Sequence, residues 1–125
     1  MVSDFEVFAT IPASDLERAK KFYAEKLGLR PVEEVTAGLF YQCRNSRFFM
    51  YPTQFAGTAQ NTSLAWEVDQ IEREVKDMRS RGVKFEEYDM PGLKTVEGIA
   101  TIGREKAAWF KDSEGNILGL TQRGK

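Results

Sequence analysis

The chain has 125 residues, 42% of them hydrophobic and 30% charged, and its formal net charge is −1. This composition is ordinary for one globular domain, and charges of both signs are interspersed without a basic stripe, so we expect neither a nucleic-acid nor a membrane partner. No apolar run approaches the roughly 20 residues that span a bilayer. The single cysteine, Cys43, excludes an internal disulfide and favours a cytoplasmic location, and the chain contains no histidine.

The first predicted helix runs from Ser14 to Gly28. Ser14 is a good N-cap, and Glu17 three residues later completes a capping box. Apolar residues recur at intervals of three and four along the segment, which predicts one apolar stripe, and Gly28 supplies the C′ position that ends the helix. The same pattern returns from Asp69, 55 residues after Ser14, with Glu72 as capping partner and Gly82 as the stop.

Strand-like segments surround both helices, so the chain is predicted to contain two copies of one β-α-β-rich module. We expect a first module over 1–52, a linker over 53–60 and a second module over 61–125. The expected strands are 5–11, 29–35, 39–44, 47–51, 63–68, 83–88, 106–111 and 116–122. The longest irregular stretch is 89–104, with a short strand possible at 98–102.

Several motifs together carry a family resemblance. They are Asp15-Leu-Glu-Arg-Ala, Phe22-Tyr23, Leu27-Gly28 and Phe110-Lys-Asp-Ser-Glu-Gly-Asn116. The chain resembles the vicinal oxygen chelate (VOC) superfamily, which includes glyoxalase I, extradiol dioxygenases and bleomycin-resistance proteins. The resemblance covers nearly the whole chain and implies an α+β fold: two tandem βαβββ modules with curved mixed sheets that enclose a cleft, often in a homodimer. It specifies the fold far better than the reaction, because one fold hosts many activities.

The resemblance also indicates where metal-using members hold their ion. The corresponding positions here are Phe8 and Ser63 on the first strand of each module, Gly119 on the last strand, and Met50. None of these side chains offers an imidazole or a carboxylate, which a divalent metal needs from several directions. We therefore expect no metal and no other cofactor.

Strand alternation, starting from those positions, predicts which residues line the cleft. Tyr41 is expected opposite Met50, and Ala108 opposite Gly119, whereas both tryptophans are expected under the helices. The predicted ligand-binding residues are Phe8, Thr10, Tyr41, Cys43, Phe48, Met50, Ser63, Glu67, Phe110 and Gly119. Such a lining is apolar and aromatic, and it suits a flat or partly apolar small molecule.

Each of these residues also has a structural interpretation. The aromatic residues can equally form core, and Cys43 without a histidine is more simply a structural thiol than a nucleophile. Glu67 is a weak candidate for a general base, although a solvated carboxylate at a strand end is the simpler interpretation. Tyr88, Met90 and Leu93 of the long irregular stretch are expected either to form a lid over the cleft or to brace a dimer.

Three functions fit these observations. The first is a metal-independent protein that binds, and thereby sequesters, a small aromatic or hydrophobic compound. The second is an enzyme related to glyoxalases or dioxygenases, a lyase or oxidoreductase with an atypical active site. The third is a non-catalytic dimeric scaffold.

Overall fold

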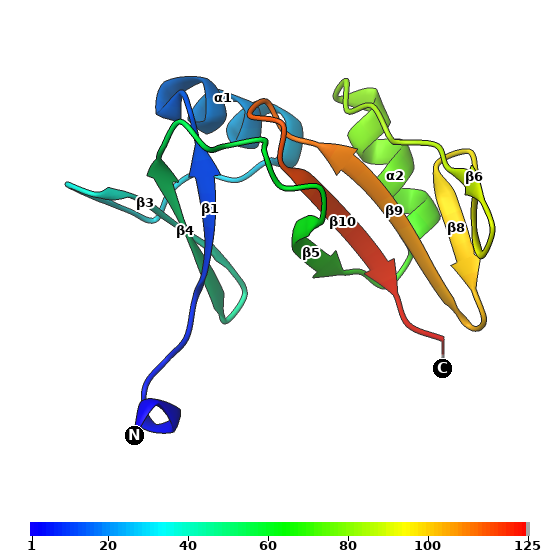
Figure 1. Ribbon diagram of the computed structural model, residues 1–125, viewed down its shortest axis with the longest axis horizontal. Helices are drawn as coiled ribbons and strands as arrows, with labels where there is room; N and C mark the ends of the chain where they lie inside the picture. Colours follow the sequence, from blue (N-terminus) through cyan, green and yellow to red (C-terminus); the bar gives the residue numbers. More distant parts are fainter. Residues whose placement is uncertain (125) are drawn as a thin grey trace.

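The computed structural model describes residues 1–124, which form two sheets side by side, each with one helix packed against it (Figure 1). Helix α1 spans Leu16–Leu27 and packs against the first sheet, and α2 spans Ile71–Ser80 and packs against the second. Both sheets are mixed, because one pair of strands in each is parallel and the others are antiparallel. The expected α+β fold is confirmed.

The first sheet comes from the first half of the chain. Its strands are β1 (Ala9–Ala13), β2 (Glu33–Val35), β3 (Gly38–Cys43) and β4 (Ser46–Pro52), in the order β1-β4-β3-β2. A short 3-10 helix, η1, spans Val2–Asp4 ahead of them. Strand β1 pairs in parallel with β4, so its other edge is free.

The second sheet comes from the second half. Its strands are β5 (Thr62–Glu67), β6 (Asp89–Met90), β7 (Leu93–Val96), β8 (Ile99–Ile102), β9 (Glu105–Lys111) and β10 (Ile117–Gln122). Their order is β5-β10-β9-β8-β7-β6, with β5 parallel to β10. Helix α2 is therefore followed by five strands, whereas α1 is followed by three.

Three strand predictions are wrong. The strand expected over 5–11 begins only at Ala9, and that expected over 29–35 is reduced to β2. Segment 83–88 forms a single bridge, between Phe85 and Phe110, because its neighbour β9 pairs with β8 instead.

The stretch 89–104 was expected to be irregular but contains β6, β7 and β8. Two-residue turns fold it into consecutive hairpins, and the short strand expected near 98–102 is confirmed as β8. In the first turn, Gly92 after Pro91 has φ 78°, and in the second both Glu97 and Gly98 have positive φ. Positive φ at both central residues is the geometry that tight hairpins favour.

The helices end as predicted but do not begin as predicted. Asp15, not Ser14, is the N-cap of α1: its Oδ1 accepts a hydrogen bond from the Arg18 amide at 3.1 Å. The N-cap of α2 is Gln70 rather than Asp69, and the Ile71 amide donates to Oε1 of Gln122 at 2.8 Å. The sequence predicted caps from residues next to each helix. In the structure, the backbone amides at the helix starts also donate to side chains near the end of the chain, Glu114 for α1 and Gln122 for α2.

Ser14 has a different partner because the carboxylate of Glu114 binds the start of α1. Glu114 lies in the β9–β10 turn, and its side chain is fully buried. It accepts hydrogen bonds from the Asp15 amide (2.8 Å), the Ser14 hydroxyl (3.1 Å) and two nitrogens of Arg18 (2.8 and 3.0 Å). One buried carboxylate thus joins the two halves of the chain.

A second set of buried polar contacts lies beside it. The Tyr23 hydroxyl donates to Oδ2 of Asp112 at 2.7 Å, and Oδ1 of Asp112 accepts from the amides of Glu114 and Asn116. The Asn116 side chain donates to the carbonyl of Pro12 on β1 at 2.8 Å. The β9–β10 turn is therefore fixed against both α1 and β1.

The apolar core is continuous between the halves. Tyr41 stacks on Phe48 at 5.0 Å, Tyr23 lies 5.5 Å from Tyr41, and Trp66 from β5 meets Phe48 at 6.4 Å. The core cluster continues from these rings to Ile71 and other residues on α2. None of the helices in the described part of the chain is long and apolar enough to cross a membrane.

We predict that Glu114 makes the fold sensitive to acid. Burial raises the pKa of this carboxyl, but its hydrogen bonds to Arg18, Asp15, Ser113 and Ser14 outweigh burial and hold the pKa at about 2. The unfolded-state value is about 4.3, so the difference corresponds to about 3 kcal/mol of folding stability. Because the folded-state pKa is the lower one, this stability is present above about pH 4 and is lost as the pH falls toward 2.

Urea unfolding measured between pH 2 and 7 tests this. Glu114→Gln is expected to lower the free energy of unfolding by about 2–3 kcal/mol at pH 7 and to flatten its decline in acid. Glu25→Gln, on the exposed face of α1, is the matched control and should change neither. If the free energy of unfolding of Glu114→Gln fell in acid as steeply as that of the wild type, Glu114 would not be the source of the acid sensitivity.

Candidate functional site

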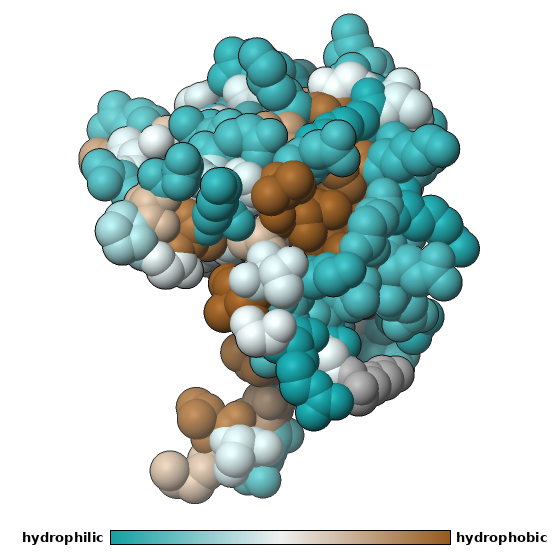
Figure 2. Space-filling model, turned by 90° about the vertical axis from the view of Figure 1, so that its right-hand side faces the viewer, coloured by the Kyte–Doolittle hydropathy of each residue, from teal (hydrophilic) through white to brown (hydrophobic). Residues whose placement is uncertain are grey.

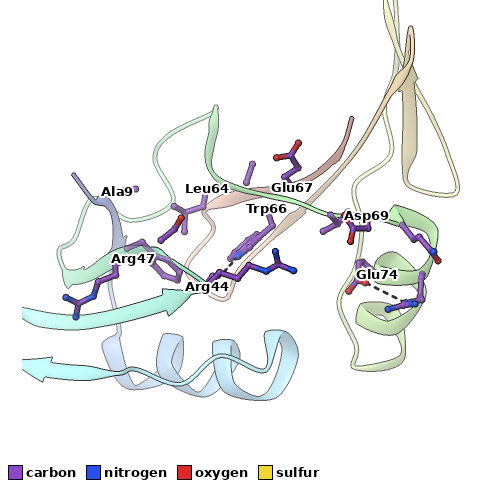
Figure 3. A pocket seen from close by; sticks show the side chains of 15 residues that line it. Ala9, Arg44, Arg47, Leu64, Trp66, Glu67, Asp69 and Glu74 are labelled. Atoms are coloured by element: carbon purple, nitrogen blue, oxygen red, sulfur yellow. Dashed lines mark hydrogen bonds and ion pairs between the residues drawn. The ribbon is translucent and has the colours of Figure 1, made fainter. Parts of the chain in front are cut away.

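A groove of about 850 Å³ lies between the two sheets (Figure 3). It is bounded by the end of the β3–β4 hairpin, by β5 and by the start of α2, and Ala9 at the start of β1 also lines it. We call it the inter-module groove. Its floor is apolar and its rim is charged. The floor residues are Cys43, Phe48, Leu64 and Trp66, and the charged rim residues are Arg44, Arg47, Glu67, Asp69, Arg73 and Glu74.

Trp66 dominates the floor. It points from β5 toward the β3–β4 turn, where Arg44 lies (Figure 3). The indole N–H donates to Sγ of Cys43 at 3.4 Å, and the ring meets that of Phe48 at an interplanar angle of 83°. Both contacts fix the indole plane, so the groove presents a preformed aromatic surface.

The charges on the rim are mostly paired. Glu67 pairs with Arg123, and Arg73 with Glu74 at 3.9 Å. Arg47 pairs with Glu33 at 3.0 Å, and its guanidinium lies 4.4 Å from the centroid of the Phe40 ring.

One cationic donor on the rim, the guanidinium of Arg44, lacks an acceptor within residues 1–124, because Arg44 forms no ion pair with any of these residues. The Nε of Arg47 is also buried without a hydrogen-bond partner, but this guanidinium lies over Phe40 on the face of the sheet opposite to Phe48. A groove with an aromatic floor and an unsatisfied cationic donor can hold a flat molecule and orient an acceptor group on it.

The structure brings three of the predicted ligand-binding residues into the groove: Cys43, Phe48 and Glu67. It places three others, Tyr41, Met50 and Phe110, under the helices with at most 1% of their surface exposed. Met50 pairs with Ile11, whose side chain is buried on the helix side, and so Met50 faces the same way. A ligand could reach Tyr41 and Met50 only by opening the core, whereas Phe110 lines a smaller cavity of about 290 Å³ that shares Cys43 and Trp66 with the groove.

Phe8 and Thr10 lie on the opposite face of the first sheet, which we call its open face because no helix covers it. Phe8 packs against Phe40 at 5.3 Å and Phe49 at 6.2 Å. Sequence reasoning missed Phe40 and Phe49, although they alternate with the buried Tyr41 and Met50. Alternation groups residues by face but does not say which group is buried.

The register expected for the last hairpin is wrong by one residue. Gly119 pairs with Trp109, not with Ala108. The expected turn was too short: five residues, from Asp112 to Asn116, separate the paired ends of β9 and β10, and the Asp112 amide donates to the Asn116 carbonyl. Trp109 therefore shares the open face of the second sheet with Gly119, whereas Trp66 lies on the helix side as expected.

Ser63 and the predicted lid residues do not line the groove. The β5–β10 register shifts at Ser63, so this residue lies in a bulge. Tyr88 packs against Trp109 at 5.6 Å, and Met90 pairs with Leu93 in the β6–β7 hairpin. That hairpin is at the far edge of the sheet from β5, with β10, β9 and β8 between it and the groove strand.

A family model matches residues 7–120, almost the whole chain, and its description is the Glyoxalase/Bleomycin resistance protein/Dioxygenase superfamily. The chain belongs to this superfamily. The resemblance seen in the sequence is thereby confirmed. No curated protein shows significant sequence similarity to the chain.

Several solved structures share the fold of this chain. UcmS2 superposes with a TM-score of 0.72 at 18% identity over 94% of this chain and 98% of its own. A glyoxalase family protein from Enterococcus faecalis gives a TM-score of 0.71 at 22% identity, over 97% of this chain and 99% of its own. TnmS3, an antibiotic binding protein from Streptomyces sp. CB03234, gives a TM-score of 0.62 at 21% identity, over 96% of this chain and 98% of its own. At these identities the likeness establishes the fold alone.

The superfamily's usual metal site does not fit this chain. Phe8 is packed against two aromatic rings, Met50 is buried, and Gly119 has no side chain. Within residues 1–124, no three cysteine, aspartate or glutamate side chains converge so that they could hold an ion. The donor set that a divalent cation requires is therefore missing from these positions.

Glu67 lies on the groove rim, but half of its side chain is exposed and it pairs with Arg123. A general base of raised pKa needs a desolvated carboxylate without a cationic partner. Glu67 is instead half exposed and has a cationic partner, so its environment does not suit a general base.

We predict that the hydroxyl of Tyr41 contributes nothing to stability. It is buried without a hydrogen-bond partner. Burial, as the larger cause, and the nearby charge of Glu34, as the smaller one, raise the pKa of Tyr41 to about 12. Tyr41→Phe is therefore expected to leave the free energy of unfolding unchanged or to raise it by up to about 1 kcal/mol.

Tyr23→Phe is the matched comparison. Burial and the neighbouring Asp112 raise the pKa of Tyr23 well above its ordinary value, and its hydroxyl donates to that carboxylate. Losing this bond should cost about 1–2 kcal/mol in urea unfolding. Equal losses in the two variants would mean that Tyr41 has a partner after all.

Proposed function

We propose that the protein binds a small, flat and partly apolar compound in the inter-module groove, without a metal ion, and thereby sequesters it. The observation that carries this proposal is the fixed indole of Trp66 at the floor, beside Phe48 and beneath a charged rim. A volume of about 850 Å³ falls within the 300–1,000 Å³ typical of ligand pockets. An aromatic ligand can stack on the indole, and an acceptor group on it can meet Arg44.

The superfamily neighbours support a binding function. TnmS3 is described as an antibiotic binding protein, and it has the same fold over nearly the full length of both chains. A binder needs a shaped surface and no reactive group, which agrees with the exposed, ion-paired state of Glu67. The alternative of a glyoxalase- or dioxygenase-related enzyme has no comparable support in the groove.

The proposal includes a homodimer as the working state. What supports it is apolar surface that the single chain leaves uncovered, above all at Phe5 and Val7, which are 75% and 94% exposed. Exposure of this extent in neighbouring residues is typical of interaction surfaces. A scaffold role alone would explain this surface but not the preformed groove.

The two tryptophans provide a direct test of the groove. Trp66 lies in the groove and Trp109 does not, so single-tryptophan variants report on the two places separately. A panel of flat aromatic compounds, neutral, anionic and cationic, is titrated into Trp109→Phe and Trp66→Phe. We expect at least one compound to quench the fluorescence of Trp109→Phe saturably and to leave that of Trp66→Phe nearly unchanged.

Affinity supplies the second readout. Trp66→Ala is expected to weaken binding of that compound about two- to tenfold, since an aromatic stacking contact is worth about 0.5–1.5 kcal/mol. Trp109→Ala should have no such effect. If no compound quenches Trp66, or if Trp109 responds instead, the groove is not the ligand site.

A further inference from the structure

A smaller cavity of about 290 Å³ lies where the end of α1 approaches the end of α2. We call it the inter-helix cavity. Lys26 and Leu27 line it from α1, Met78 lines it from α2, and Phe110 and Leu120 line it from the second sheet. Unlike the apolar N-terminal segment, which projects from the body of the protein (Figures 1 and 2), this apolar surface surrounds a space. A concave apolar space with a few polar groups is the usual form of a small-molecule site.

The two helix ends meet at the cavity through glycines. Gly28 ends α1 with φ 69°, and a Cβ atom at this position would lie 3.6 Å from Nη1 of Arg81. Gly82 follows α2 with φ 92°, and a Cβ atom there would lie only 2.9 Å from Nζ of Lys26. Each helix end therefore presents a cation to the turn that follows the other helix. The ammonium of Lys26 is held at the junction of the two ends, beside the cavity.

Lys26 is the charged residue of the cavity lining that has no ion pair within residues 1–124. The other charged residues of the lining are paired: Asp77 with Arg81 at 3.4 Å, Glu74 with Arg73 at 3.9 Å, and Glu67 with Arg123. Lys26 is also half-buried, so water solvates its charge only in part. The charge left without a partner at the cavity is therefore positive, and it suits an anionic group on a ligand.

The apolar lining differs from that of the inter-module groove. It is mostly aliphatic or sulfur-containing, and these residues are Leu27, Leu29, Cys43, Val68, Met78 and Leu120. The Phe110 ring is already engaged by an edge contact with Phe85 at 5.5 Å. Native interiors contain few voids larger than a water molecule, and apolar cavities of about 150 Å³ bind small hydrocarbons. A flexible alkyl chain suits this narrow lining, whereas a flat aromatic plate suits the floor of the groove.

We propose that the inter-helix cavity is a second binding site, which takes an alkyl carboxylate of medium chain length. The chain lies among Leu29, Met78 and Leu120, and the carboxylate meets the ammonium of Lys26. The site is distinct from the inter-module groove, although Trp66 lines both spaces. The inference is independent of the function proposed for the groove.

The methionines provide a reporter for this cavity. The chain has four methionines, of which Met78 lines the cavity and none lines the groove. The protein is labelled with ¹³C at its methionine methyl groups, and octanoate is added while NMR spectra are recorded. We expect the Met78 signal to shift saturably and the other three signals to stay in place. The variant Met78→Leu identifies the signal, because it conserves the side-chain volume and removes only that methyl resonance.

Charge supplies the second readout. Octanamide has the same chain as octanoate but no charge, and we expect it to bind at least about threefold more weakly. Lys26→Gln should weaken octanoate by a similar factor and leave octanamide unchanged. Lys21→Gln is the matched control, because Lys21 is exposed on the same helix and lines neither the cavity nor the groove. It should alter the binding of neither compound.

Three results would overturn the inference. The absence of a saturable Met78 shift would mean that the cavity does not accept the chain. Equal affinities for octanoate and octanamide, unaffected by Lys26→Gln, would mean that the site does not recognise a carboxylate. Arg44→Gln should leave octanoate binding unchanged. If Arg44→Gln weakened it and Lys26→Gln did not, octanoate would lie in the groove, with the change at Met78 transmitted through Trp66.

Discussion

The buried carboxylate of Glu114 is the interaction on which the arrangement of this protein depends. Taking a carboxylate out of water is costly, and only several converging donors make it stable. Here the donors come from the start of α1, while the carboxylate comes from the β9–β10 turn. The first half of the chain thus completes the hydrogen bonding of the second, and separating the two sheets would break all of the hydrogen bonds between Glu114 and the start of α1.

The position of the groove follows from this anchor. The contacts of Asp112 and Asn116 with Tyr23 and Pro12 fix the β9–β10 turn against β1 and α1. Because β10 pairs with β5, the same turn sets where β5 lies relative to β1. The helix-side surfaces then meet through Phe48 and Trp66, and a space is left between the end of the β3–β4 hairpin, β5 and the start of α2. A groove with an aromatic floor is the result.

Much of the fold could be predicted because its signals are local. Periodic apolar residues specified both helices, Gly28 ended the first in the left-handed conformation, and the hairpin of β3 and β4 followed from alternation and a short turn. The helix starts were mispredicted because their partners, Glu114 and Gln122, are remote in sequence. Segment 83–88 was also mispredicted as a strand for a non-local reason, because its pairing depended on which strand lies beside β9.

The candidate site was predicted only in part, and the division has a physical reason. The sequence alone determined that no histidine is available. The family resemblance added the expectation that Phe8, Met50, Ser63 and Gly119 stand where metal-using members hold their ligands. Alternation also placed Tyr41 and Met50 on one face correctly, but the expected pairing of the two is wrong: Tyr41 pairs with Phe48, and Met50 with Leu39. Only the tertiary structure decided which group faces a helix, because a strand has two equivalent faces until its neighbours are placed. Turn length decided the partner of Gly119, and the approach of the two sheets turned Trp66 from a core residue into the floor of a groove.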